Sequence, residues 1–156
     1  MSDAEVSVHI DAPADAVYSL VSDLTRMGEW SPECTKVAWR DGATGPRVGA
    51  TFRGWNSRGP LRWFTDGKVS AAEPGRSFAF DVTSFGIGVA RWGYGIEPDG
   101  DGPGCTLTET WDDHRSTVFK KITGLAIGVP DRRAHNTAGM EATLAKIKAA
   151  AEATSG

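Results

Sequence analysis

The chain has 156 residues, of which 40% are hydrophobic and 24% are charged, a composition typical of one folded domain rather than of a disordered or fibrous protein. Lys and Arg number 17 and Asp and Glu number 20, and this net charge of −3 argues against a nucleic-acid-binding protein, which usually has a basic surface. No apolar run approaches the roughly 18 residues that a membrane-spanning helix requires.

The N-terminus, from Met1 to Glu5, is polar and acidic, unlike a secretory signal, which has a basic start and an apolar stretch. Two cysteines, Cys34 and Cys105, are too few for a disulfide framework. We therefore expect a cytoplasmic protein with reduced thiols.

A strand followed by two short helices is predicted at the start of the chain. Apolar residues alternate with polar ones over residues 6–10, which indicates a strand with one buried face. Asp11-Ala12-Pro13 marks a helix start, because Pro fits the first turn of a helix, and apolar residues at helical spacing follow as far as residue 24. Residues 23–30 are expected to form a second short helix that meets a turn at Ser31-Pro32.

The middle of the chain shows only strand and turn patterns. Strands are predicted at residues 35–41, 48–57, 61–73, 76–84, 88–97 and 104–113. Turn sequences such as Asp41-Gly42 and Glu73-Pro74-Gly75 separate them. Such short connections favour antiparallel pairing, because parallel strands need long crossovers.

The C-terminal part contains one long helix, predicted over residues 131–153 with Asp131 as its cap. One stripe of this helix carries Asn136, Met140, Leu144, Ile147 and Ala151. Residues 152–156 are expected to fray as a flexible tail. Before the helix, residues 114–130 contain a glycine-interrupted apolar segment that is typical of a short helix, a flexible lid or both. With no repeat or linker, residues 1–156 are expected to form a single domain.

This order of elements predicts an α+β fold in which a curved seven-stranded antiparallel sheet wraps around the C-terminal helix. An antiparallel sheet with one apolar face must be covered, and the last helix is the only long amphipathic element available. A strongly curved sheet around that helix would enclose a cavity.

The order of elements and four segments resemble the START-like helix-grip superfamily (SRPBCC), and within it the polyketide cyclase/dehydrase branch, particularly its uncharacterised actinobacterial members. The segments are residues 8–13 (VHIDAP), 29–33 (EWSPE), 72–80 (AEPGRSFAF) and 106–111 (TLTETW). The resemblance extends from about residue 6 to about residue 150. It implies a deep apolar cavity between the sheet and the C-terminal helix, in a superfamily that includes cyclases, lipid carriers, hormone receptors, oxygenase domains and quinone-binding proteins.

Alternation along each strand predicts which residues face this cavity, provided that no β-bulge reverses the faces. The apolar sets place aromatic residues on alternate positions of neighbouring strands, which is typical of an aromatic pocket. Its expected ligand-binding residues are Trp63, Phe78, Phe80, Trp92, Leu107 and Trp111 from the sheet, and Asn136, Met140 and Leu144 from the helix. Phe52 and Thr65 are expected on the same inner face.

Glu109 lies between two inward-facing apolar residues, Leu107 and Trp111. It is either a carboxylate of the cavity or one half of a structural ion pair with Arg91 or Arg53, and we favour the ion pair, because such networks perturb carboxylates as often as active sites do. If aromatic residues desolvate Glu109, its pKa should rise, and the group could act as a general acid or base near neutral pH.

Other polar residues have two interpretations each. Asn56 could donate to a ligand carbonyl or, more commonly for such a residue, satisfy backbone groups of the turn at 57–60. Tyr94 could donate its phenol proton inside the cavity or pack in its wall. Asn136 could brace the helix or point at a ligand, and His135 is expected to be exposed at the helix start. Trp30 and Glu33 could border the entrance, although packing against the short helices is the more common role.

Common motifs for metal and cofactor binding are missing. Gly86-Ile87-Gly88 lacks the third glycine and the following helix of a dinucleotide loop. The three histidines have no metal-ligand spacing, and no Gly-x-Ser-x-Gly elbow occurs. We therefore expect neither a metal nor a cofactor.

The main hypothesis is a protein that binds a hydrophobic small molecule such as a polyketide, a lipid or an isoprenoid. The alternative is a polyketide cyclase or dehydratase with Glu109 as general base and Tyr94 and Asn56 as hydrogen-bond donors. A third possibility is an interaction module that docks through residues 114–130. Nucleic acid is not an expected partner, whereas a second copy of the chain is a candidate.

Overall fold

The computed structural model describes residues 2–115 and 132–155. The helices are α1 (Ala14–Ser22), a 3-10 helix η1 (Leu24–Glu29) and α3 (Arg132–Ser155). The strands are β1 (Ala4–Ile10), β2 (Cys34–Arg40), β3 (Thr51–Arg58), β4 (Leu61–Glu73), β5 (Ser77–Ser84), β6 (Ile87–Pro98) and β7 (Cys105–Asp113). The predicted α+β fold with two short helices after the first strand is confirmed.

Most of the predicted boundaries agree with these elements to within two residues. One difference is the strand expected from residue 48, which begins at Thr51; Gly49, with a φ of 91°, and Ala50 precede it and exchange backbone hydrogen bonds with Val69 of β4. Another is the C-terminal helix, which continues to Ser155. Glu152 there accepts hydrogen bonds from the backbone of Asp11 and from Lys148, so the expected tail is helical, and its flexibility stays a prediction. The predicted cap at Asp131 and most of the segment 114–130 lie outside the described residues.

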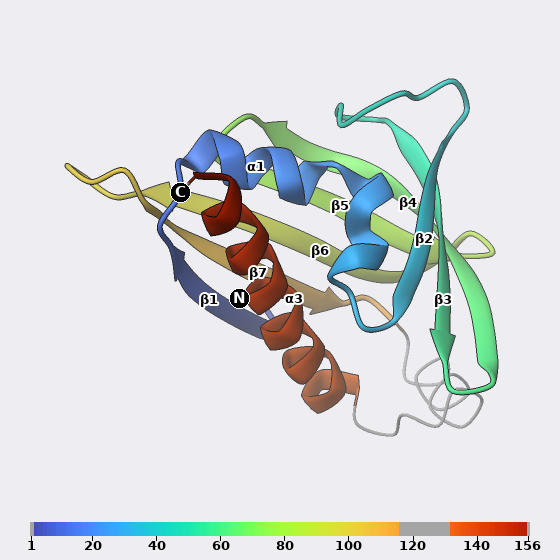
Figure 1. The fold of residues 1–156 in the computed structure, drawn as a ribbon. Coiled ribbons are helices and arrows are strands. Elements are labelled where there is room, and N and C mark those ends of the chain that lie inside the picture. The colour runs from blue at the N-terminus through green and yellow to red at the C-terminus, as the bar shows by residue number, and fades with distance from the viewer. Residues whose placement is uncertain (1, 116–131, 156) are drawn as a thin grey trace.

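The seven strands form one antiparallel sheet in the order β1-β7-β6-β5-β4-β3-β2. Figure 1 shows α1 and α3 on the same side of this sheet, and the sheet bends so that β2 and β3 come round toward the helices. The predicted curvature is therefore confirmed, and it comes from a sheet that curls at the β2 edge.

The main core lies where the helices touch the sheet. Helix α3 packs chiefly against β1, with further contacts to β7 and α1, and its buried stripe contains Met140, Leu144, Ile147 and Ala151. Helix α1 packs on β5 and β6. Neither helix packs extensively against β3 or β4. The inner face of the sheet between α3 and these two strands is thus left to line a cavity.

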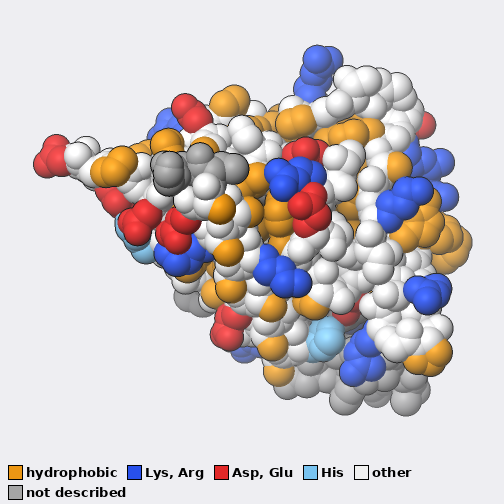
Figure 2. Space-filling model, in the orientation of Figure 1, with side chains coloured by type: hydrophobic (Ala, Val, Ile, Leu, Met, Phe, Trp, Pro, Cys, Tyr) orange, Lys and Arg blue, Asp and Glu red, His pale blue; other side chains and the backbone are white. Residues whose placement is uncertain are grey.

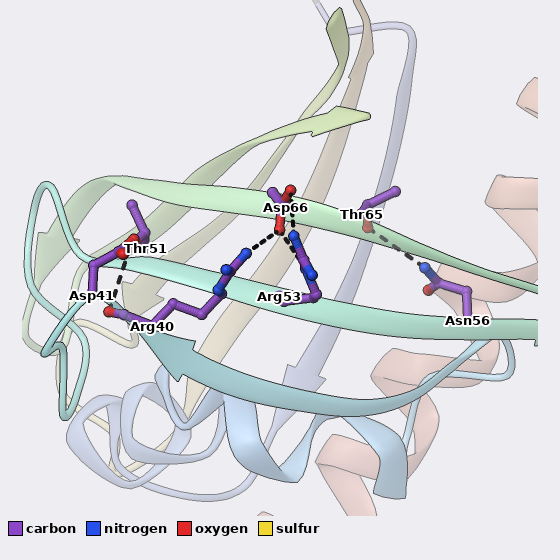
Figure 3. A network of polar contacts seen from close by, with 7 residues as sticks. All are labelled: Arg40, Asp41, Thr51, Arg53, Asn56, Thr65 and Asp66. Atoms are coloured by element: carbon purple, nitrogen blue, oxygen red, sulfur yellow. Dashed lines mark hydrogen bonds and ion pairs between the residues drawn. The ribbon is translucent and has the colours of Figure 1, made fainter. Parts of the chain in front are cut away.

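The outer face of the sheet carries ion pairs. Figure 3 shows Arg40 of β2 and Arg53 of β3 converging on Asp66 of β4, at 3.2 and 2.8 Å respectively. The two guanidinium groups hold the pKa of the Asp66 carboxyl below its ordinary value. These contacts join β2, β3 and β4 to one another at the curled edge of the sheet.

Hydrophobic side chains are exposed beside Lys and Arg on the side of the molecule where β2, β3 and β4 lie (Figure 2). Exposed apolar residues include Trp55 of β3, Leu61 of β4, Phe85 of the β5–β6 turn and Ile87 of β6, and 82% of the Phe85 surface is accessible. In the part of the chain that the structure describes, no helix is long and apolar enough to cross a membrane.

Candidate functional site

A cavity of about 660 Å³ lies between the inner face of the sheet and the first half of α3. This volume falls within the range of roughly 300–1,000 Å³ typical of small-molecule sites. Nine of the predicted site residues line it: Asn56, Trp63, Phe80, Trp92, Tyr94, Glu109, Trp111, Asn136 and Met140. Phe52 and Thr65 line it as well.

The strand register explains why the aromatic residues share one wall. Phe80 of β5 lies opposite Trp92 of β6, which in turn lies opposite Trp111 of β7. The rings of Trp92 and Trp111 have centroids 6.4 Å apart. Phe52 of β3 packs edge-on against Phe80 at 5.2 Å. Because directly opposed residues point to the same face, three neighbouring strands produce a continuous aromatic surface.

Three irregularities interrupt the strand register, but none reverses the predicted wall. They lie between Cys34 and Lys36 on β2, between Val69 and Ala71 on β4, and at Val89 of β6, opposite Val82 and Thr83 of β5. The last two are located beyond the positions that line the predicted wall on β4, β5 and β6. The bulge on β6 brings Val89 to the cavity beside Ala90.

Three predicted ligand-binding residues do not line the cavity. Phe78, Leu107 and Leu144 are fully buried in the core. The ring of Phe78 packs edge-on against Tyr18 of α1, with centroids 6.4 Å apart. All three residues face inward as predicted, but they lie at the end of the sheet that α1 and α3 cover. Protein side chains therefore occupy the space that a ligand would need there.

Glu109 occupies the centre of β7 and is only 3% exposed. The phenol of Tyr94, directly opposite on β6, donates a hydrogen bond to Glu109 Oε2 at 2.9 Å. Oε1 has no hydrogen-bond partner among the described residues. Burial raises the pKa of this carboxyl to about 8, while the Tyr94 hydrogen bond acts in the opposite direction.

The predicted ion pair of Glu109 is wrong. Arg91 pairs with Asp81 at 2.7 Å and Arg53 pairs with Asp66 at 2.8 Å, both on the outer face of the sheet. The physical reason is strand alternation, since each arginine is adjacent to an inward-facing residue and therefore points outward. The cavity carboxylate, which we considered less favoured, is what the structure shows.

Tyr94 and Asn56, which each had two predicted roles, both line the cavity wall. Tyr94 is buried, and burial together with the neighbouring Glu109 raises its pKa well above the ordinary value. Asn56 lines the cavity, and its amide donates a long hydrogen bond of 3.5 Å to Thr65 on β4 instead of bonding to the turn at 57–60 (Figure 3). The turn role expected for Asn56 is therefore not observed.

A contact at the cavity border was missed by sequence reasoning. His135, expected to be exposed, is half-buried and bonds through Nε2 to Glu33 Oε2 at 2.9 Å. Both residues line the cavity, and together they connect the start of α3 to the turn before β2. They are 102 residues apart, so no local spacing could have revealed the pair. Trp30, considered for the entrance, is buried and does not line the cavity.

Cys34 also lines the cavity and was not predicted to do so. Burial raises the pKa of its thiol to about 11, so the thiol is protonated at neutral pH and is not an activated nucleophile. No group of three or more His, Cys, Asp or Glu side chains that could hold a metal ion is found among residues 2–115 and 132–155.

Comparisons with known proteins agree on the family. A family model described as polyketide cyclase/dehydrase and lipid transport matches residues 1–152. The solution structure of the Polyketide_cyc-like protein Cgl2372 from Corynebacterium glutamicum is 38% identical, with a TM-score of 0.62. That alignment covers 95% of this chain and 90% of that one. A comparison with curated protein sequences finds no match.

Two proteins described as di-domain ARO/CYC share the fold. StfQ from the steffimycin biosynthetic pathway has a TM-score of 0.69 at 16% identity, and BexL from the BE-7585A pathway has 0.65 at 20% identity. The alignments cover 97% and 96% of this chain. The chain spans about half the length of each, 50% of StfQ and 49% of BexL.

Proposed function

Because the chain belongs to the polyketide cyclase/dehydrase and lipid transport family, we propose that it binds a hydrophobic small molecule between the sheet and α3. A polyketide, a lipid or an isoprenoid has the required chemistry. The observation that carries this proposal is the cavity of about 660 Å³ with its aromatic wall. Burial of an apolar ligand against such a wall would contribute roughly 25 cal/mol for each Å² removed from water.

A cavity-filling variant tests this function. Gly54 of β3 lines the cavity, and a methyl group added there would lie 3.8 Å or more from its nearest neighbours, in ordinary contact. Gly54→Leu should therefore keep the fold while its side chain occupies ligand space. Gly95 of β6 is exposed and has open space around it, so Gly95→Leu is the matched control.

The measurement is binding of the fluorescent hydrocarbon 1,6-diphenylhexatriene, combined with native mass spectrometry of purified protein. We expect saturable binding to the parent chain and to Gly95→Leu, and at least about tenfold weaker binding to Gly54→Leu, because the larger side chain leaves too little room. Equal binding to all three would place the probe outside the cavity and contradict the proposal.

A second candidate function is polyketide cyclase or dehydratase activity, favoured by a buried carboxyl with one unpartnered oxygen in the cavity wall. A pKa of about 8 makes the ionised form of Glu109 a stronger base than an ordinary carboxylate. Glu109 would remove the acidic proton between two carbonyls through its unpartnered oxygen Oε1, with Asn56 as a donor to the enolate. Tyr94 would be the second donor once its phenol proton turns from the newly protonated carboxyl to the enolate oxygen.

Deuterium exchange at the central carbon of a long-chain 2,4-diketone tests this activity. We expect catalysed exchange to fall by about 100-fold or more in Glu109→Gln, because the amide cannot accept the proton. An unchanged rate would remove Glu109 from the mechanism. The cytoplasmic location and the homodimer stay predictions, to be checked by fractionation and by sedimentation.

A further inference from the structure

Among the described residues of the cavity wall, Glu109 has a buried side-chain oxygen without a hydrogen-bond partner. Glu109 Oε2 accepts from Tyr94, whereas Oε1 is buried and has no partner among the described residues. Leaving a buried polar atom unpaired is unfavourable, because the atom has given up its hydrogen bonds to water. Glu109 lines the cavity, so a molecule inside it is positioned to supply the missing partner.

The proton of Glu109 determines which kind of partner fits. Oε2 already accepts the Tyr94 proton, so in the neutral carboxyl the acidic proton resides on Oε1. Oε1–H is then a donor that requires an acceptor. Burial keeps the group mainly in this neutral form at pH 7, since its pKa is about 8.

We propose, building on the proposed function, that Glu109 and Tyr94 form a polar subsite for an uncharged hydrogen-bond acceptor of the ligand, such as a ketone or ester carbonyl. The ligand enters with this carbonyl toward β6 and β7 and its apolar part against Phe80, Trp92 and Trp111. A carboxylate head group is disfavoured at the same place, because burying an anion without a cation is costly.

The surroundings of Glu109 support an uncharged subsite. Opposite it lie Tyr94 on β6 and the apolar Val6 on β1. Helix α3 presents Asn136, Met140 and Thr143 to the cavity, none of which is charged. The other titratable or charged residues described in the lining are Glu33, Cys34, Arg62, Arg115 and His135. Of these, His135 pairs with Glu33 and Arg115 pairs with Asp113, while Arg62 is exposed.

The test is competition of 2-undecanone and undecanoate against bound 1,6-diphenylhexatriene at pH 6.5. The dye has no hydrogen-bonding group, so its own binding reports only the hydrophobic cavity. We expect the ketone to compete about tenfold better with the parent chain than with Glu109→Leu, which is the effect of one hydrogen bond. Glu109→Gln should retain this affinity, because its amide can donate to the carbonyl.

The pH dependence supplies a second measurement that does not need the leucine variant to fold. Ketone affinity of the parent chain should fall as the pH passes 8, since the ionised carboxylate has no proton to donate, whereas affinity of Glu109→Gln should stay level. The proposal is overturned if undecanoate competes as well as the ketone, or if both chains show the same pH profile. Absence of dye binding would instead refute the proposed hydrophobic cavity function.

Discussion

The phenol of Tyr94 donates to one oxygen of Glu109 at 2.9 Å, and the other oxygen of that carboxyl meets no described partner. The two residues face each other across β6 and β7, in a wall that is otherwise largely apolar. A carboxyl held in this way is destabilised when it ionises, because burial removes water and a single neutral donor does not replace it. The chemistry expected of the cavity follows from this arrangement.

Stability should depend on the protonation of Glu109. Its pKa is raised from 4.5 to about 8, so between these values the folded chain holds a proton that the unfolded chain has lost. The stabilisation that this proton gives to the folded chain is complete below pH 4.5. It is lost as the pH rises toward 8, and the free energy of unfolding falls by up to about 1.4 kcal/mol per pH unit. Urea unfolding from pH 5 to 9 should show this decline in the parent chain and not in Glu109→Gln. If the free energy of unfolding changed with pH in the same way for both chains, this dependence on Glu109 would be refuted.

Removal of the Tyr94 phenol should leave both oxygens of Glu109 without a donor. Since this hydrogen bond lowers the pKa of Glu109, Tyr94→Phe should raise that pKa further and lower stability by about 1–3 kcal/mol. The pH at which stability stops falling should move upward in the same urea titrations. Tyr18→Phe is the matched control, because Tyr18 is also buried but does not line the cavity. If Tyr18→Phe moved this pH by the same amount as Tyr94→Phe, the effect would not be specific to the hydrogen bond with Glu109.

Gly67 of β4 makes room for an aromatic ring of the wall. The ring of Phe52 lies over it from β3, so that a methyl group at this position would overlap the ring. Gly67→Ala should displace Phe52 and destabilise the chain by about 1–3 kcal/mol. Gly95→Ala, at an open position of β6, should change stability much less. Equal thermal midpoints for the two variants would mean that Phe52 adapts without cost.

The pair between His135 and Glu33 should affect how fast a ligand leaves. It joins α3 to the turn before β2 at the border of the cavity. A partly exposed pair contributes no more than about 1 kcal/mol, so His135→Ala should raise the dissociation rate of diphenylhexatriene by about fivefold or less. Stopped-flow mixing with lipid vesicles as acceptor measures this rate.

His9→Ala serves as the control for that experiment. His9 forms a comparable pair with Asp99, also at 2.9 Å, but does not line the cavity. Its substitution should leave the dissociation rate unchanged. If both variants accelerate release equally, the His135–Glu33 pair has no special part in ligand exit.

Residue alternation was sufficient to predict the inner wall. Phe80, Trp92 and Trp111 face the cavity as expected, because successive side chains of a strand point to opposite faces and the bulges lie elsewhere. The same alternation places Arg53 and Arg91 on the outer face of the sheet and Glu109 on the inner face. It therefore excludes both arginines as partners of Glu109. That signal was present in the sequence.

Other features depend on contacts between distant parts of the chain. Phe78 and Phe80 have the same parity on β5, yet Phe78 meets Tyr18 of α1 and belongs to the core, whereas Phe80 lines the cavity. Only the position of α1 over one end of the sheet separates their roles. The placement of His135 beside Glu33 likewise depends on how α3 lies relative to the turn before β2.

The order of elements, the antiparallel pairing and the inward direction of the aromatic wall residues were determined by the sequence alone, because these properties depend on periodicity and on short turns. The tertiary structure decided where the inner face is filled by protein and where it is hollow. It also decided that Glu109 has Tyr94 as its partner and no cation, since burial and electrostatic surroundings arise from residues far apart in the chain.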